Sequence, residues 1–205
     1  MTQLGKREAS ANRGTSETII EVRVNLDGHG EPDVSTGQGF FDHLLTALCV
    51  HSMIDMQVSA KGDLQTGCHH LLEDCGLCLG SALGQAVAKG PRIRRFGWAL
   101  VPMDETLAQV AIDISGRPLA EVRLPEGAVG ALSTQDAAEF IRGLAASMSA
   151  TIHVDLLKSG NAHHGMEAVF KCLGTSLRQA LEIDPRRVAV PSSKGEVSVT
   201  TCSAL

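Results

Sequence analysis

Two short segments of the chain carry a histidine pair with a glutamate three residues further on. The first reads His69-His70-Leu71-Leu72-Glu73, and the second reads His163-His164-Gly165-Met166-Glu167. Imidazole and carboxylate ligands without a thiolate favour manganese, iron or zinc. On a helix the first histidine and the glutamate share a face, whereas adjacent imidazoles diverge by about 100°. We therefore expect two metal ions, each drawing ligands from more than one element.

The two histidine segments belong to an internal duplication. Beyond the histidine pairs, the segments 78–86 and 172–180 agree at six of nine positions at a constant offset of 94 residues. Two alternating segments, 17–28 and 105–116, each begin with Glu-Thr and end at a glycine, as strands with one covered face do. The sequence therefore predicts two similar halves.

Apolar spacing predicts the same order of strands and helices in both halves. Helices are expected over 39–51 and 137–146 and at both histidine pairs, and strands over 54–60, 151–157 and 119–124. In this alignment His43 corresponds to Glu139, at an offset of 96 residues. The predicted fold is α/β, of the α+β type, with two sheets and helices packed between them.

Composition and charge exclude several classes of protein. The net charge of −5 argues against nucleic acid as a partner, because phosphate binding needs a basic surface. No apolar run approaches the ~20 residues of a membrane span, and the polar first residues do not resemble a signal peptide. A cytoplasmic protein without membrane contact is expected. The local basic cluster Arg92, Arg94 and Arg95 suits a small anionic ligand.

The six cysteines are interpreted mainly as buried thiols of a reducing compartment, because most lie in apolar segments. Cys75 and Cys78 have redox-like spacing but fall within a predicted helix. Cys68, beside His69, offers a zinc alternative with the same two thiols. The second half has Ala162 at the position of Cys68, so the symmetric histidine and glutamate set is preferred.

A series of motifs resembles the imidazoleglycerol-phosphate dehydratase family from about residue 13 to residue 195. The motifs are Glu17-Thr18, Asn25-Leu26-Asp27-Gly28, Gly39-Phe40-Phe41-Asp42-His43, Lys61-Gly62-Asp63-Leu64, both histidine pairs with their glutamates, Arg95-Phe96-Gly97, Pro102-Met103-Asp104-Glu105, Asp113-Ile114-Ser115-Gly116-Arg117-Pro118 and Pro191-Ser192-Ser193-Lys194-Gly195. The resemblance implies a duplicated half-fold like the second domain of ribosomal protein S5. It also implies a homo-oligomer of 24 subunits with two manganese ions per active site at subunit interfaces.

The resemblance assigns roles to individual residues. The implied metal ligands are His43, His69, His70, Glu73, Glu139, His163, His164 and Glu167. The implied substrate contacts are Glu17, His51, Arg95, Arg117, Ser193 and Lys194. Many relatives have histidine in place of Glu139, aspartate in place of Cys68 and threonine in place of Leu71, and we expect these departures to affect metal affinity more than function. Iron or zinc are expected as substitutes for manganese.

The implied reaction is the dehydration of D-erythro-imidazole glycerol phosphate to imidazole acetol phosphate in histidine biosynthesis, through a metal-bound imidazolate. Glu17 is the candidate base or proton shuttle, against an ordinary strand-start carboxylate. His51 is the candidate proton donor, against a histidine that caps its own helix. Arg95, Arg117, Ser193 and Lys194 are expected to hold the phosphate.

The same motifs lead to an expected division of the chain within one compact body. Residues 1–15 are predicted to be a mobile lead-in, 16–90 and 91–190 the two halves, and 191–205 a substrate-binding tail. Two other classes of function stay open. A metal-storage or metal-assembled shell explains the histidines and glutamates but not Arg95, Arg117 and Lys194. An RNA-binding module fits the S5-like topology but not the acidic charge.

Overall fold

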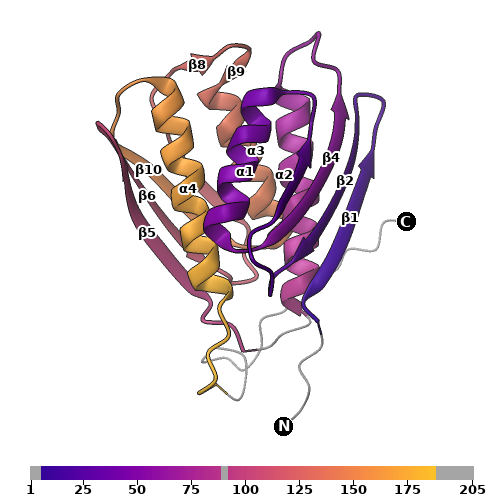
Figure 1. Cartoon of the computed structure of the whole chain (residues 1–205), viewed down its shortest axis with the longest axis vertical. Coiled ribbons are helices and arrows are strands. Elements are labelled where there is room, and N and C mark those ends of the chain that lie inside the picture. The colour runs from indigo at the N-terminus through magenta and orange to yellow at the C-terminus, as the bar shows by residue number, and fades with distance from the viewer. Residues whose placement is uncertain (1–5, 89–91, 188–205) are drawn as a thin grey trace.

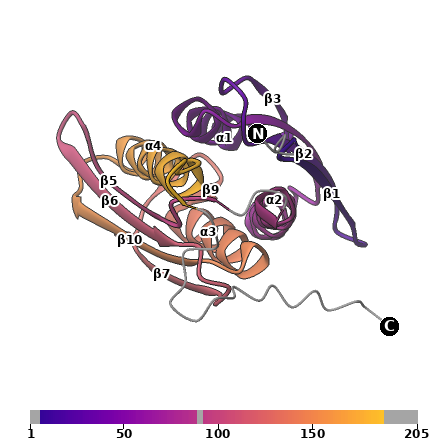
Figure 2. The same cartoon turned by 90° about the horizontal axis from the view of Figure 1, so that it is seen from below.

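The computed structural model describes residues 6–88 and 92–187, which form two four-stranded sheets with four helices between them (Figure 1, Figure 2). The first sheet contains β1 (Glu8–Gly14), β2 (Thr18–Asn25), β3 (Pro32–Ser35) and β4 (Asp55–Gly62). The second contains β5 (Phe96–Met103), β6 (Thr106–Asp113), β7 (Leu119–Arg123) and β10 (Thr151–Lys158). The helices are α1 (Gly39–Ser52), α2 (His69–Ala88), α3 (Thr134–Met148) and α4 (Ala162–Leu181), and β8 (Ala128–Val129) pairs with β9 (Leu132–Ser133). The predicted fold class is confirmed.

The two sheets repeat one topology. Their strand orders are β1-β2-β4-β3 and β5-β6-β10-β7, and in each sheet only the last pair is parallel. Even the register repeats, because Val22 lies opposite Val58 in the first sheet and Val110 lies opposite Val154 in the second. The duplication inferred from the motifs therefore extends through the sheets.

The helix layer supplies the core that both sheets cover. Ile20, Val22 and Val24 alternate inward along β2, as their spacing predicts, whereas Ile19 points outward and is 61% exposed. Between the helices, the rings of Phe41 and Phe140 lie 5.5 Å apart edge to face. Contacts of this kind join helices of one half to helices of the other.

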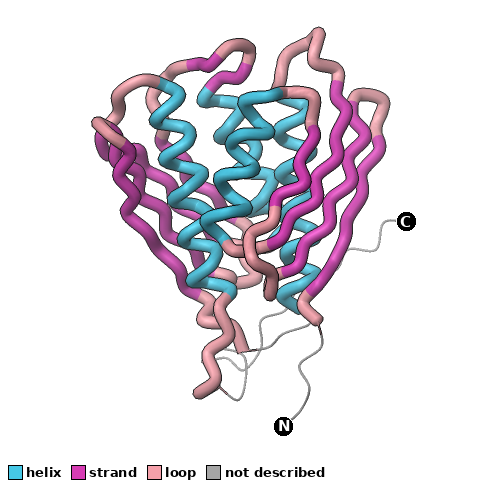
Figure 3. Tube along the Cα trace, viewed as in Figure 1, coloured by secondary structure: helices cyan, strands magenta, loops and turns pink. Residues whose placement is uncertain are grey.

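Figure 3 shows the helices, in cyan, between the two sheets, in magenta. Each helix of the first half packs in parallel on a helix of the second half: α2 on α3, and α1 on α4. Along α2, Gly76 approaches the carbonyl of Phe140, and Gly80 approaches that of Leu144 one turn later. In α4, Gly174 lies so close to α1 that a methyl group there would be 2.7 Å from the Leu48 carbonyl oxygen. Because these glycines have no side chain, the helix backbones can come close together. The close contacts determine which ends of the helices lie side by side.

Two expectations about the ends of the chain have different outcomes. The prediction of a mobile lead-in through residue 15 is wrong for Glu8–Gly14, which pairs with β2 as an edge strand. Just before this strand, the Arg7 side chain is 5% exposed, and its guanidinium donates to the Leu181 carbonyl at 2.7 Å. The predicted tail, 191–205, lies outside the described residues. Within the described residues, no helix is both long and apolar enough to cross a bilayer.

Candidate functional site

The second histidine pair opens α4 and meets α1. Asn161 caps the helix, since its side-chain oxygen accepts the backbone N–H of His164 at 2.8 Å. His43 Nε2 lies 3.1 Å from Glu167 Oε2, and His163 Nε2 lies 3.2 Å from the same oxygen. The parallel packing of α1 on α4 therefore brings His43 next to His163 and Glu167, which lie more than 100 residues later in the sequence.

The geometry of His43, His163 and Glu167 fits a divalent ion. Their ligand atoms all lie within 4.8 Å of one another. An ion about 2.1 Å from each of two ligand atoms would hold those atoms about 3.0–3.5 Å apart, which matches the observed nitrogen–oxygen spacings. Two imidazoles and one carboxylate are also an appropriate donor set for manganese, iron or zinc.

Glu167 is kept ionised although it is buried. Its burial favours the neutral acid, but Lys171 Nζ lies 2.8 Å from its second oxygen and His43 faces the first. These contacts outweigh the burial and lower the pKa of Glu167 to about 2. The carboxylate is therefore charged over the whole pH range in which a metal ion would bind.

His164 faces a different carboxylate, at the turn between β5 and β6. Its Nδ1 lies 3.0 Å from Glu105 Oε2 and 3.9 Å from Asp104 Oδ2. Hydrogen bonds from its own backbone N–H and from His164 lower the pKa of Glu105. Both residues belong to a motif quoted from the sequence but received no predicted role there, and the structure places Glu105 nearer to the histidine.

The first histidine pair repeats part of this arrangement at the start of α2. His69 Nε2 lies 3.6 Å from Glu73 Oε2 within the helix. His70 Nδ1 lies 3.1 Å from Asp63 Oδ2 and 3.7 Å from Glu17 Oε2. Asp63 was quoted in the sequence motif but was not predicted as a site residue. The sequence feature that could have identified it is its place in the short loop between the predicted strand and the helix that begins at His69, seven residues before His70.

Glu139 does not join either group of potential ligands among the described residues, which are His43 with His163 and Glu167, and Asp104 with Glu105 and His164. It forms an ion pair with Arg142 one turn later on α3. On α3, Gly143 packs against the Glu73 backbone carbonyl, so Glu139, one turn earlier, belongs to the end of α3 that lies beside the start of α2.

The backbone at Glu17 belongs to a turn that a partly buried polar network fixes. The neighbouring Thr18 hydroxyl donates to Asp74 Oδ2 at 2.6 Å, and Arg13 Nε donates to Asp74 Oδ1 at 2.7 Å. Thr15 Oγ1 accepts the backbone N–H of Glu17 at 3.1 Å. The turn between β1 and β2 is thereby fixed, while the Glu17 carboxylate itself stays exposed beside His70.

His51 lies two helical turns from His43 on α1 and packs beside Gly174. Partial burial, together with the positive charge of Lys171, lowers the pKa of His51. Its imidazole is therefore neutral near pH 7. A proton donor at this position would first have to acquire its proton.

The predicted phosphate contacts lie at the other end of α4. Arg95 Nε donates to Asp113 Oδ1 at 2.6 Å, and an Arg117 nitrogen lies 3.8 Å from the other oxygen of the same carboxylate. The backbone N–H of Arg95 donates to the Ala180 carbonyl at 2.9 Å, sixteen residues beyond His164. At 1.5 Å per residue this is about 24 Å along the helix. Ser193 and Lys194 lie outside the described residues.

The five cysteines within residues 6–88 and 92–187 take no part in these groups. Cys49, Cys68, Cys75, Cys78 and Cys172 are free and buried. Burial raises the pKa of Cys78 to about 11 and also raises the pKa of Cys75, so neither thiol ionises readily at neutral pH. Neither group of potential metal ligands among the described residues contains a thiol, which disfavours the zinc alternative.

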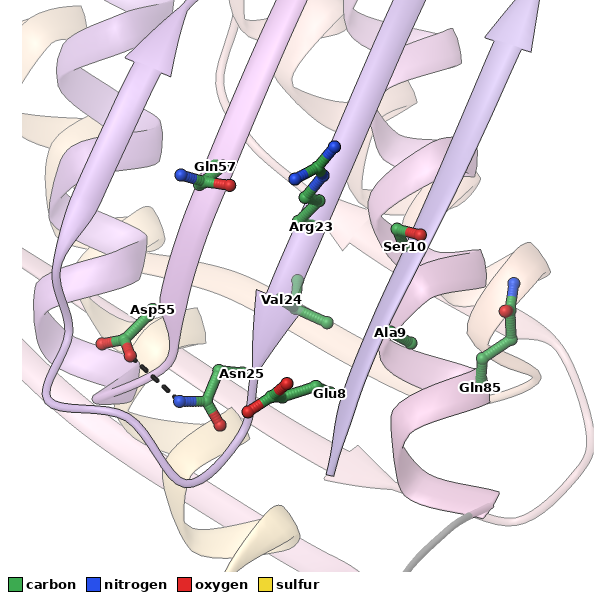
Figure 4. Close-up of a pocket in the computed structure, with 9 residues that line it drawn as sticks. All are labelled: Glu8, Ala9, Ser10, Arg23, Val24, Asn25, Asp55, Gln57 and Gln85. Carbon is green, nitrogen blue, oxygen red and sulfur yellow. Dashed lines mark hydrogen bonds between the residues drawn. The ribbon is translucent and has the colours of Figure 1, made fainter. Parts of the chain in front are cut away.

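A hollow of about 640 Å³ over β1, β2 and β4 is separate from the predicted site (Figure 4). Figure 4 shows Arg23, Gln57 and Ser10 along these strands, with Asn25 donating to Asp55 at one end. None of its lining residues was predicted to bind metal or substrate.

Comparisons with known proteins agree with the motifs. A family model described as imidazoleglycerol-phosphate dehydratase matches residues 36–177. The chain is 47% identical over 194 residues to such an enzyme of a Polaromonas species, covering 93% of this chain and 94% of the relative. It is 46% identical over 194 residues to one from Moorella thermoacetica, covering 94% and 99%.

Solved structures show the same likeness. The crystal structure of imidazoleglycerol-phosphate dehydratase from Staphylococcus aureus superposes with a TM-score of 0.77 at 33% identity, covering 86% of this chain and 99% of that one. The corresponding structure from Pyrococcus furiosus gives a TM-score of 0.76 at 38% identity, covering 90% and 98%. Fold and sequence are thus shared over nearly the whole length.

Proposed function

The chain belongs to the imidazoleglycerol-phosphate dehydratase family and is a hydro-lyase of histidine biosynthesis, and we propose that its dehydration of D-erythro-imidazole glycerol phosphate depends on two bound divalent metal ions. The observation that carries the metal dependence is the convergence of His43, His163 and Glu167 at metal-ligand spacing. Manganese is the preferred ion of the proposal, with iron or zinc as substitutes.

The proposed metal-binding residues come from all four helices. They are His43, His69, His70, Glu73, Glu139, His163, His164 and Glu167. When bound, the ions would act as Lewis acids that let the substrate's imidazole ring carry negative charge, which would favour departure of the hydroxyl from the carbon next to the ring. The protein's contribution is to hold neutral imidazoles and charged carboxylates at fixed positions, so that little reorganisation is needed when substrate arrives.

The chain's own groups would handle the protons and the phosphate. Glu17, whose carboxylate is exposed beside His70, is proposed to take the proton from the second carbon of the glycerol chain, while the hydroxyl leaves from the carbon next to the ring. His51 is proposed to pass a proton to the leaving hydroxyl, as a shuttle rather than as a standing acid. Arg95, Arg117, Ser193 and Lys194 are proposed to hold the phosphate.

Metal removal tests the proposed function directly. Protein stripped with a chelator and dialysed is expected to convert substrate to imidazole acetol phosphate at least about 10³-fold more slowly, since the Lewis acid would be lost. Added Mn²⁺ should restore the rate, and added Mg²⁺, which prefers oxygen ligands, should restore little. Full activity of verifiably metal-free protein would contradict the proposal.

The distance between the two predicted parts of the site supports an active site shared between chains. The start of α4 carries His164 and its end contacts Arg95, about 24 Å away along the helix axis. A three-carbon phosphate ester with one imidazole ring is much shorter than this. We therefore propose that histidines of one chain and arginines of another meet at a subunit interface, within a homo-oligomer of up to 24 subunits.

Complementation between inactive variants tests the shared site. His164→Ala and Arg117→Ala should each be nearly inactive when expressed alone. Co-expressed in equal amounts, they should regain up to about a quarter of wild-type activity. In a random mixture, about half of the shared sites receive an intact His164 from one chain, and about half of those also receive an intact Arg117 from the other chain. Activity measurements on the purified mixture decide the matter: a mixture no more active than the separate variants would mean that each chain builds its site alone.

A further inference from the structure

The second histidine of each pair has one ring nitrogen on a carboxylate. His70 Nδ1 lies 3.1 Å from Asp63, and His164 Nδ1 lies 3.0 Å from Glu105. The first histidine of each pair differs, because His69 and His163 approach the glutamates of their own helices through Nε2. In each pair, the first histidine therefore contacts a carboxylate through Nε2 and the second histidine contacts one through Nδ1.

This contact determines which nitrogen of His70 and His164 can bind a metal ion. An ionised carboxylate only accepts hydrogen bonds, so in the neutral imidazole the proton must be on Nδ1. The lone pair is then on Nε2, which points away from the carboxylate. Carboxylate contacts of this kind hold metal-binding imidazoles in one tautomer and one ring orientation.

The two carboxylates are themselves held in place. The Thr66 hydroxyl donates to Asp63 Oδ2 at 2.8 Å, and the Asp63 side chain is 16% exposed. Glu105 Oε1 accepts the backbone N–H of Asn161 at 3.1 Å, and Asn161 is the residue that caps the helix of His164. Both carboxylates therefore join their histidine to a neighbouring turn.

Asp63 and Glu105 do not correspond to one another in the duplication. Glu105 corresponds to Glu17, because each stands in a Glu-Thr pair at the start of the second strand of its sheet. Glu105 contacts its histidine at 3.0 Å, but Glu17 stays 3.7 Å from His70 Nδ1, where Asp63 is the closer partner. The equivalent carboxylates thus have different surroundings in the two halves.

We propose that Asp63 and Glu105 are positioning residues that orient His70 and His164 for metal binding, and that Asp63 thereby leaves Glu17 available to the substrate. This inference rests on the proposed function, since it takes the two histidines as metal ligands. It adds a division of labour: one glutamate of the duplicated pair orients a histidine, and the other acts on substrate.

Equilibrium binding of Mn²⁺ or Zn²⁺ alone to the full chain, without substrate, tests the orienting role. Asp63→Asn and Glu105→Gln are each expected to weaken metal binding by about 10–100-fold. Asp63→Glu, which keeps the charge, should recover most of the affinity. The matched control is Asp155→Asn, a carboxylate paired with Arg123 on the second sheet, and it should stay within about twofold of wild type.

Glu17→Gln tests the division of labour. It should leave metal affinity within about twofold of wild type while lowering kcat with little change in KM. If Asp63→Asn and Glu105→Gln bind metal as wild type does, the orienting role is overturned. If Glu17→Gln weakens metal binding as much as Asp63→Asn, the division of labour is overturned. Failure of the proposed function would look different, because wild type itself would then bind neither ion.

Discussion

Glu167→Gln is expected to lower kcat/KM by at least about 10³-fold, which corresponds to about 4 kcal/mol of lost transition-state stabilisation. The reason is the position of the Glu167 carboxylate, which faces His43 and His163 at 3.1 and 3.2 Å and contacts Lys171 on its other side. An amide there is a weaker metal ligand, and it leaves the Lys171 ammonium without its counter-charge beside the cation site.

Activity and metal content measured on the same preparation check this expectation. The variant should lose about one bound ion per chain together with its activity. Glu182→Gln is the matched control, because Glu182 follows the same helix, is exposed and pairs with Arg94. It should behave as wild type. Retention of both the metal and the activity in Glu167→Gln would remove the buried carboxylate from the proposed mechanism.

Gly76→Ala is expected to reduce the free energy of unfolding by about 3 kcal/mol. A methyl group on Gly76 would overlap the backbone carbonyl of Phe140, which belongs to α3 and cannot turn aside as a side chain would. To make room, α2 and α3 would have to separate, and their separation would open the packed core on both sides of the contact.

Gly84→Ala is a matched control on the same face of α2. Its added methyl group would lie 3.6 Å from the nearest atoms of Ser147 and Met148, an ordinary contact. Because alanine favours helix more than glycine does, this variant should be neutral or slightly more stable. Denaturant unfolding at one fixed chain concentration compares the two, since subunit association would shift both midpoints. Equal stability of both variants would show that α2 and α3 do not pack as described.

The strands that sequence patterns predicted are those whose side chains reach the core. The alternation of Ile20, Val22 and Val24 was readable because each second residue is covered. Strand β1 left no such pattern, since Glu-Ala-Ser-Ala-Asn-Arg-Gly packs little apolar surface. It is held by backbone hydrogen bonds to β2, and those bonds leave no trace in the sequence.

The sequence by itself determined which residue types are available to the site and how they are spaced within each helix. His69 with Glu73, and His163 with Glu167, are neighbours wherever those helices lie, because four residues make about one turn. The same local rule showed that adjacent histidines diverge. The motifs also led to the correct family, since their order is independent of the packing.

Only the tertiary structure decided which helices meet, and hence which distant side chains share a ligand group. His43 meets Glu167 because α1 and α4 pack in parallel at Gly174. Asp63 is closer to His70 than Glu17 is, because the turn after β4 places Asp63 beside the histidine. Such choices depend on close contacts between backbones and on loop paths over long sequence separations. Side-chain periodicity within one element contains no information about either.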